Sequence, residues 1–128
     1  MPEHLSSSRF GDVMLRRFEQ PDETRPMQKG SFEVVRLGGT TIGRAIYQPG
    51  WRWSDDVGQA LNQQYCAVEH LGLVLAGTLV AQFSRNGHVI ALRAGDLFYI
   101  PPEPHDSWVV GTEPYVSVHI IGAGKYTR

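Results

Sequence analysis

Paired turn residues divide this sequence into short extended segments, and this punctuation is what most constrains its fold. Gly38-Gly39 separates SFEVVRL (31–37) from TTIGRAIYQ (40–48), and Asn86-Gly87 separates TLVAQFSR (78–85) from HVIAL (88–92). Such pairs supply the positive backbone φ angles of tight turns, and Asn-Gly is the pair best suited to a two-residue type I′ turn. The flanking segments are rich in β-branched and aromatic residues, so the sequence predicts two antiparallel hairpins.

Three further extended segments follow the second hairpin, at Leu97–Ile100, Asp106–Val110 and Tyr115–Ile121. Prolines and glycines separate them, and proline cannot donate a ladder hydrogen bond, so it belongs at strand ends and turns. Short strands with closely spaced turns are typical of an antiparallel sandwich or barrel. We therefore predict an all-β fold.

The length of 128 residues fits one domain. A net charge of -1 gives no electrostatic reason to bind nucleic acid or an anionic membrane, and no apolar stretch approaches the length of a membrane span. The one cysteine, Cys66, excludes an internal disulfide. We expect a cytoplasmic protein that has neither nucleic acid nor membrane as a partner.

The first 30 residues are predicted to form an N-terminal arm and a leading strand, and residues 31–128 a single barrel domain. Residues 1–12 are polar and rich in serine, which is typical of a loose or partner-bound arm. The next stretch, VMLRRFEQPDETRP (13–26), fits either a short helix that stops at Pro21 or a strand. Hydrophobic periodicity favours neither.

Polar groups gather at the head of a predicted buried strand, in QQYCAVEHLGLVL (63–75). If this stretch is extended, Gln64, Cys66 and His70 point to one face, and Glu69 points to the other. His105 lies just past a proline turn at the head of another strand. Two imidazoles with a thiol or amide suit a zinc, iron, nickel or manganese ion with open coordination positions.

These residues resemble the motifs of the cupin superfamily, whose small double-stranded β-helix, or jelly-roll barrel, usually holds a metal ion at its mouth. The second cupin motif is similar to Gly95, five residues and Pro101, with Glu103 in place of a glycine and His105 one position early. In the first motif, Gly77 sets the register and His70 takes the usual glutamate position. The resemblance covers about residues 40–121 and implies the jelly-roll fold.

The resemblance also implies a ligand set of Gln64, Cys66, His70 and His105 for one divalent metal ion. Gln64 and Cys66 stand where cupins usually carry two histidines. Alternatives remain for each side chain. Cys66 fits a buried, unreactive thiol, His70 and His105 fit hydrogen-bonded core histidines, and Gln64 fits a hydrogen bond to a ligand or water.

Four other residues are candidate contacts for a small organic molecule. Trp51 and Trp53 share one strand face and suit an aromatic or apolar ligand, the core or a dimer interface. Arg44 fits either an anionic ligand or the surface, and His119 shares a face with Ser117 and fits either the cavity or the core.

Three functions follow as hypotheses. The first is a metal-dependent enzyme of dioxygenase, isomerase or cyclase type acting on a small organic molecule, with the paired tryptophans favouring an aromatic or apolar one. The second is a ligand-binding or sensor barrel that has no catalytic activity and needs no metal, which the missing pair of motif histidines favours. The third is a structural dimerisation domain. Because cupins commonly dimerise through sheet faces, a homodimer is expected in each case.

Overall fold

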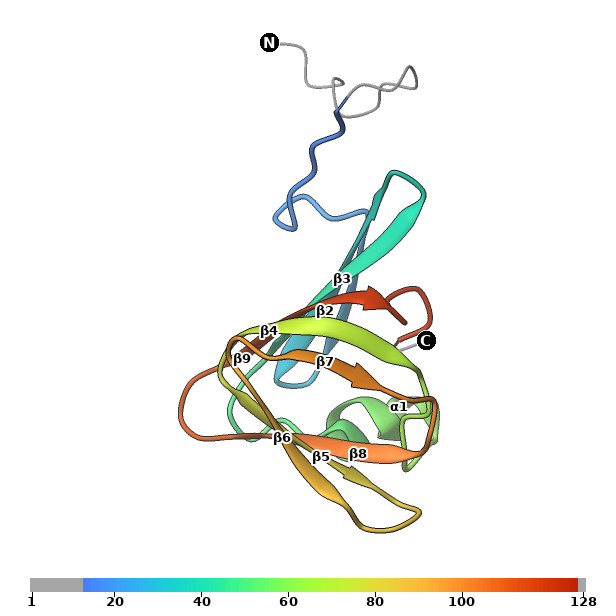
Figure 1. The fold of residues 1–128 in the computed structure, drawn as a ribbon, viewed down its shortest axis with the longest axis vertical. Helices are drawn as coiled ribbons and strands as arrows, with labels where there is room; N and C mark the ends of the chain where they lie inside the picture. The colour runs from blue at the N-terminus through green and yellow to red at the C-terminus, as the bar shows by residue number, and fades with distance from the viewer. Residues whose placement is uncertain (1–12, 127–128) are drawn as a thin grey trace.

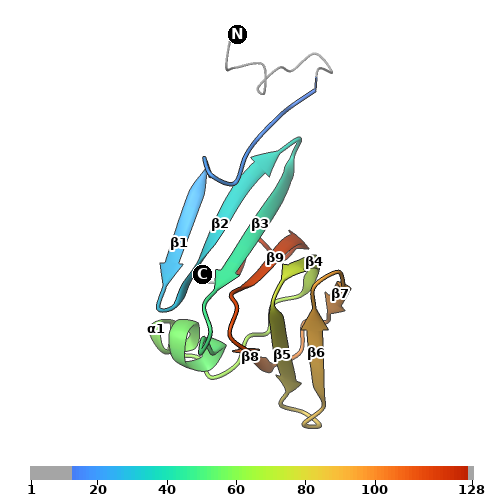
Figure 2. The same cartoon turned by 90° about the vertical axis from the view of Figure 1, so that its left-hand side faces the viewer.

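Two antiparallel β-sheets face each other in the computed structural model, which describes residues 13–126 (Figure 1). The larger sheet has six strands in the order β1-β2-β3-β9-β4-β7. Its strands are β1 (Glu23–Met27), β2 (Gly30–Leu37), β3 (Thr40–Tyr47), β4 (His70–Ala76), β7 (Leu97–Ile100) and β9 (Tyr115–Ile121). The β2–β3 hairpin extends past the region where the two sheets pack (Figure 2).

The smaller sheet has three strands in the order β6-β5-β8. It consists of β5 (Thr78–Phe83), β6 (Val89–Arg93) and β8 (His105–Val110). A π-helical turn (Ser54–Gly58) and one turn of helix α1 (Gln59–Leu61) link the first hairpin to the strands that follow. This architecture confirms the all-β, jelly-roll fold predicted from the sequence.

The core lies between the sheets, as strand alternation requires. Phe32, Ala45 and Tyr115 point inward from the larger sheet, and Ala81 and Val109 point inward from the smaller one, each less than 7% exposed. Neighbouring residues on the same strands face outward. Each sheet therefore contributes one apolar face to a shared interior.

Both predicted hairpins are present, but the second has a different turn. Gly38 and Gly39 both have positive φ, at 57° and 79°, as a type I′ turn requires. At the second turn Gly87 has a φ of 70° and Asn86 does not have a positive φ. The Asn86 side chain instead accepts a hydrogen bond from the His88 amide, and the chain stays in a longer loop from 84 to 88. The type I′ prediction is therefore wrong for this hairpin.

Two segments, residues 13–26 and the residues that follow Gln64, are less regular than the sequence pattern predicts. Of the stretch 13–26, residues 23–26 belong to strand β1, and residues 13–22 form neither helix nor strand. Arg16 ties residues 13–22 to the sheet by donating to the carbonyl of Arg36, and it also forms an ion pair with Asp22. The predicted arm at 1–12 lies outside the described residues. The expected continuous strand from Gln64 is also wrong over its first part, because β4 begins only at His70.

No helix among residues 13–126 is long and apolar enough to cross a membrane.

Gly77, which turns the chain from the larger sheet into the smaller one, should tolerate a side chain poorly. Its φ is 76°, and a Cβ there would collide with the carbonyl oxygen of Pro114. Gly39 has a similar φ of 79° but open space around it. Both Gly→Ala variants incur the left-handed penalty of about 1–2 kcal/mol. Gly77→Ala should lose about 1–3 kcal/mol more unfolding free energy in urea titrations than Gly39→Ala; equal losses would contradict the close approach.

Candidate metal centre

Cys66, His70 and His105 meet in the interior at one end of the two sheets. One ligand atom from each side chain lies within 4.8 Å of the others, and every one of these residues is at most 4% exposed. The Cys66 Sγ lies 3.6 Å from His70 Nε2. The three side chains that sequence parity and motif position selected are therefore brought together.

Backbone pairing explains why segments far apart in the sequence converge here. The Cys66 amide donates to the His105 carbonyl and the His105 amide donates to the Cys66 carbonyl, each over 2.9 Å. His70 comes from the first position of β4, where it pairs with Ile100 of β7. The site therefore joins both sheets and the short segment that precedes β4.

The ring of His105 is oriented by a backbone acceptor. Its Nδ1 lies 2.8 Å from the carbonyl oxygen of Glu103, and a carbonyl can only accept, so Nδ1 carries the proton. This leaves Nε2 unprotonated and able to bind a metal, which is the usual way in which proteins fix a ligating histidine. The proline-rich turn before β8 thus sets the tautomer as well as the position of His105.

Asp106 anchors the neighbouring segment to β8. Its carboxylate accepts hydrogen bonds from the Ser54 amide at 3.0 Å and the Ser54 hydroxyl at 2.8 Å, and forms an ion pair with Arg52 at 3.1 Å. The guanidinium of Arg52 also lies 4.4 Å from the ring of Trp108. These contacts hold the π-helical turn beside the strand that carries His105.

A cavity of about 30 Å³ lies among these side chains, with His119 and Tyr126 in its wall. This volume is about that of one water molecule or one ion. Within residues 13–126, His70 Nδ1 and His119 Nδ1 are buried without a hydrogen-bond partner. Leaving a polar group in that state costs about 1–3 kcal/mol, so the fold holds both imidazoles at a free-energy cost.

Burial controls the protonation of the cluster. Desolvation lowers the pKa of His70 well below its usual value, with further lowering from the nearby His119 and His105. Desolvation also lowers the pKa of His105, and it lowers that of His119 to about 4. The pKa of Cys66 is raised to about 11 for the same reason. At neutral pH the imidazoles are therefore uncharged and ready to ligate, while the thiol would have to lose its proton.

Gln64 does not join the cluster, contrary to the expectation from the motif. Its side chain is exposed and lines a separate hollow on the surface beside Gln63 and Gln59. The reason is that the chain is not a regular strand between 64 and 69, so alternation does not carry Gln64 to the face of Cys66 and His70. The site therefore has three of the four side chains that were predicted.

The two tryptophans occupy different environments. Trp51 is fully buried, stacks on Tyr47 with 3.8 Å between ring centroids, and directs its Nε1 to Met27 Sδ at 3.3 Å. It does not line the cavity, whereas Trp53 does, and Trp53 Nε1 has no partner among the described residues. The prediction that both rings share a strand face is wrong because residues 51–53 turn into the π-helical segment.

Arg44 lies away from the cavity on the outer face of β3. Its guanidinium pairs with Glu33 at 2.8 Å and with Glu19 at 3.1 Å, and it lies 5.1 Å from the ring of Phe18. The inward neighbours are Gly43 and Ala45, so strand alternation excludes Arg44 from the interior. The predicted contact between Arg44 and a ligand in the barrel is therefore wrong.

His119 lies in the cavity wall, where its Nε2 is 2.9 Å from the hydroxyl of Ser117. Its ring centroid is 5.3 Å from that of His70, but it lies outside the group of three clustered ligand atoms. The structure thus places it at the predicted cavity. Its role toward a ligand stays a prediction.

Tyr126 is a wall residue that sequence reasoning missed. Its hydroxyl is 2.7 Å from that of Tyr47, and its ring centroid is 5.1 Å from that of His70. Arg25 of β1 holds this segment by donating to the carbonyls of Ala123, Gly124 and Tyr126. The only sequence signal is one large aromatic residue after the small residues GAG, beyond the last predicted strand.

Solved structures with the same fold are found at low sequence identity. A protein of unknown function from Rhizobium leguminosarum bv. viciae 3841 is 18% identical with a TM-score of 0.60, over 86% of this chain and 96% of that one. The polyketide cyclase RemF from Streptomyces resistomycificus is 13% identical with a TM-score of 0.62, over 86% of this chain and 80% of that one.

A variant of oxalate decarboxylase from Bacillus subtilis is 18% identical with a TM-score of 0.60, and the match covers 90% of this chain and 31% of the decarboxylase. The sequence matches no family model and no curated protein sequence. Together with the strand order, these similarities show that the chain has the cupin fold that its motifs predicted.

The lowered pKa of His119 predicts a loss of stability in acid. The unfolded chain protonates this imidazole below a pKa of about 6.5, whereas the native chain keeps it neutral down to about 4. The stabilisation is complete above the unfolded value and falls as pH falls. Between pH 7 and pH 5, His119 should account for about 2 kcal/mol of lost unfolding free energy in the metal-free protein.

Urea titrations in a chelator test this expectation with two variants. His119→Gln should lose about 2 kcal/mol less than the wild type over the same pH interval. His88→Gln changes an exposed histidine and should keep the wild-type pH dependence. Identical pH dependence in all three proteins would show that His119 is not held neutral by burial.

Proposed function

We propose that this protein is a small cupin that binds one divalent transition metal ion through Cys66 Sγ, His70 and His105 and that binds or acts on a small organic molecule. The observation that carries the proposal is the spacing of the ligand atoms. Sulfur at about 2.3 Å and nitrogen at about 2.0 Å from a tetrahedral ion lie about 3.5 Å apart. The Cys66 Sγ to His70 Nε2 distance of 3.6 Å fits that geometry.

The donor set supports the same function. A thiolate and two imidazoles favour zinc, iron or nickel over hard ions such as magnesium, and manganese is less suited to the thiolate. Three protein ligands leave at least one coordination position free for water or substrate. A metal bound here would supply Lewis-acid chemistry by polarising a substrate oxygen or a water molecule.

The chain itself would orient the ligands and exclude water. The carbonyl of Glu103 fixes His105, and the aromatic rings of Tyr126 and Phe98 enclose the cavity. Because the imidazoles are neutral, one proton, that of Cys66, has to leave when the metal binds. The activities named for two proteins of the same fold, polyketide cyclisation and oxalate decarboxylation, support small organic molecules as the ligand class.

We also propose that the protein is a cytoplasmic homodimer, in line with the sequence expectation.

A barrel that has no catalytic activity and needs no metal is the second candidate. The observation in its favour is that only three of the four motif positions reach the interior, because Gln64 is exposed. The raised pKa of Cys66, about 11, also favours a neutral thiol when no metal is present. Metal titration separates the two candidates.

Metal-free protein titrated with Zn²⁺, Fe²⁺, Ni²⁺ and Mn²⁺ should bind one equivalent of at least one ion, measured by elemental analysis after desalting. Cobalt(II) should give the charge-transfer absorption of a thiolate–cobalt bond, and Cys66→Ser should abolish it. Cys66→Ser, His70→Gln and His105→Gln should each weaken binding by more than about 100-fold, because outer-shell substitutions alone cost 10–100-fold.

Two control variants sharpen the result. His88→Gln removes an exposed histidine, and Gln64→Ala removes the motif residue that faces solvent. Both should bind metal as the wild type does. Substoichiometric metal in the wild type, or equal affinity in all variants, would overturn the metal function in favour of the metal-free barrel.

A further inference from the structure

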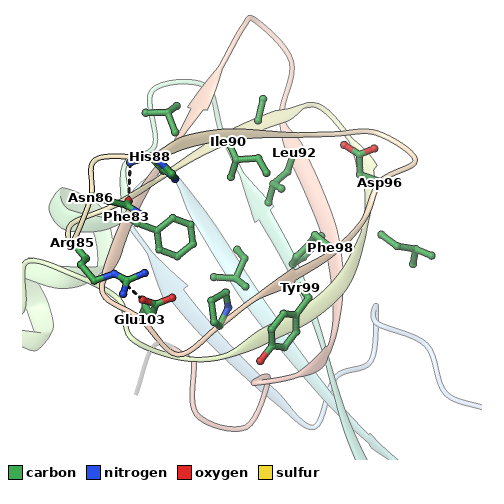
Figure 3. A pocket seen from close by; sticks show the side chains of 15 residues that line it. Phe83, Arg85, Asn86, His88, Ile90, Leu92, Asp96, Phe98, Tyr99 and Glu103 are labelled. Carbon is green, nitrogen blue, oxygen red and sulfur yellow. Dashed lines mark hydrogen bonds and ion pairs between the residues drawn. The ribbon is translucent and has the colours of Figure 1, made fainter.

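A groove of about 710 Å³ opens between β6 and β7, the strands at the unpaired edges of the two sheets (Figure 3). Ile90 and Leu92 face it from β6, Phe98 faces it from β7, and Phe83 lies at its floor. Ile90 remains 53% exposed, although it lies on the inward face of its strand with Leu92. The groove is therefore a concave, largely apolar surface that residues 13–126 leave uncovered.

The groove and the metal cavity share one wall. Leu92, Phe98 and Ile100 line both spaces. Phe83 also lines the groove, and its ring centroid lies 5.7 Å from that of His105. A single layer of side chains thus separates the groove from the clustered ligand atoms.

Size and chemistry indicate what the groove would hold. Its volume lies within the range of about 300–1,000 Å³ that is typical of small-molecule sites, whereas the 30 Å³ metal cavity is far too small for an organic ligand. Phe83 and Phe98 supply aromatic surfaces that favour another ring by edge and offset contacts. The charged lining residues are Arg85, which pairs with Glu103 at 3.4 Å, and Asp96 at the opposite end of the groove (Figure 3).

Pairing with a second chain fits these edges less well. Strands β6 and β7 have only five and four residues, and prolines at 101 and 102 follow β7 at once. Short edges and prolines are features by which proteins discourage strand addition. The concave shape between the edges suits a compact molecule better than an added strand.

We infer that the groove between β6 and β7 binds a mainly apolar, aromatic small organic molecule, which lies against the shared wall beside the metal cavity. Its approach to a metal rests on the proposed function, but binding in the groove does not. Movement of the shared wall, formed by Leu92, Phe98 and Ile100, would join the two spaces.

Fluorescence titration of the metal-free protein with naphthol tests the groove by itself. Ile90→Ser should raise the dissociation constant about fivefold, because it removes apolar surface from the groove. Leu75→Ser is the matched control, since Leu75 is 52% exposed on β4 and lies outside the groove. It should stay within twofold of the wild type. Equal weakening by both variants, or binding that does not saturate, would overturn the inference.

Proton relaxation of bound naphthol tests the position of the groove in protein loaded with a paramagnetic ion that it binds, Mn²⁺ or Co²⁺. Strong enhancement that Ile90→Ser weakens and Leu75→Ser preserves would support a ligand beside the metal cavity. Normal relaxation with stoichiometric metal would overturn that placement. If no metal binds, the proposed metal function fails, while the metal-free titration still decides the groove.

Sedimentation that shows a dimer lost only in Ile90→Ser would assign the groove to a second copy of the chain and overturn the inference.

Discussion

The reciprocal backbone hydrogen bonds between Cys66 and His105 are the constraint on which the site depends. They attach the segment before β4 to the outer edge of β8, where Arg52 and Trp108 form a second isolated bridge. Together these bridges cover an edge that would otherwise expose unpaired backbone groups. The same contacts that close the barrel on this side bring the thiol beside the imidazoles.

Local signals predicted the fold well because they act over a few residues. Glycine pairs and prolines set the turns, and β7 and β9 have the bounds that the sequence predicted. The site was harder to predict because strand alternation holds only while a strand continues. His70 begins a regular strand and was placed correctly, whereas Gln64 precedes an irregular stretch. Tyr126 was missed because its position depends on the long-range contact of its segment with Arg25.

The interior places polar side chains where apolar ones would pack with less free-energy cost. Cys66, His70, His105 and His119 are all buried, and their shifted pKa values show that desolvation disfavours their charged forms. Such groups are neutral without an occupant, so the empty barrel avoids an unpaired buried charge. The unpartnered Nδ1 atoms of His70 and His119 carry the free-energy cost instead.

The hydrogen bonds that Arg25 donates to the carbonyls of Ala123, Gly124 and Tyr126 join the C-terminal segment to the first strand. Because Tyr126 belongs to the cavity wall and Arg25 belongs to β1, fraying of the first strand and loosening of the wall are one coupled opening. An occupant of the interior would therefore slow amide hydrogen exchange in β1, although that strand lies at the far edge of the larger sheet. The rate of amide hydrogen exchange in β1 would therefore depend on whether the interior of the barrel is occupied.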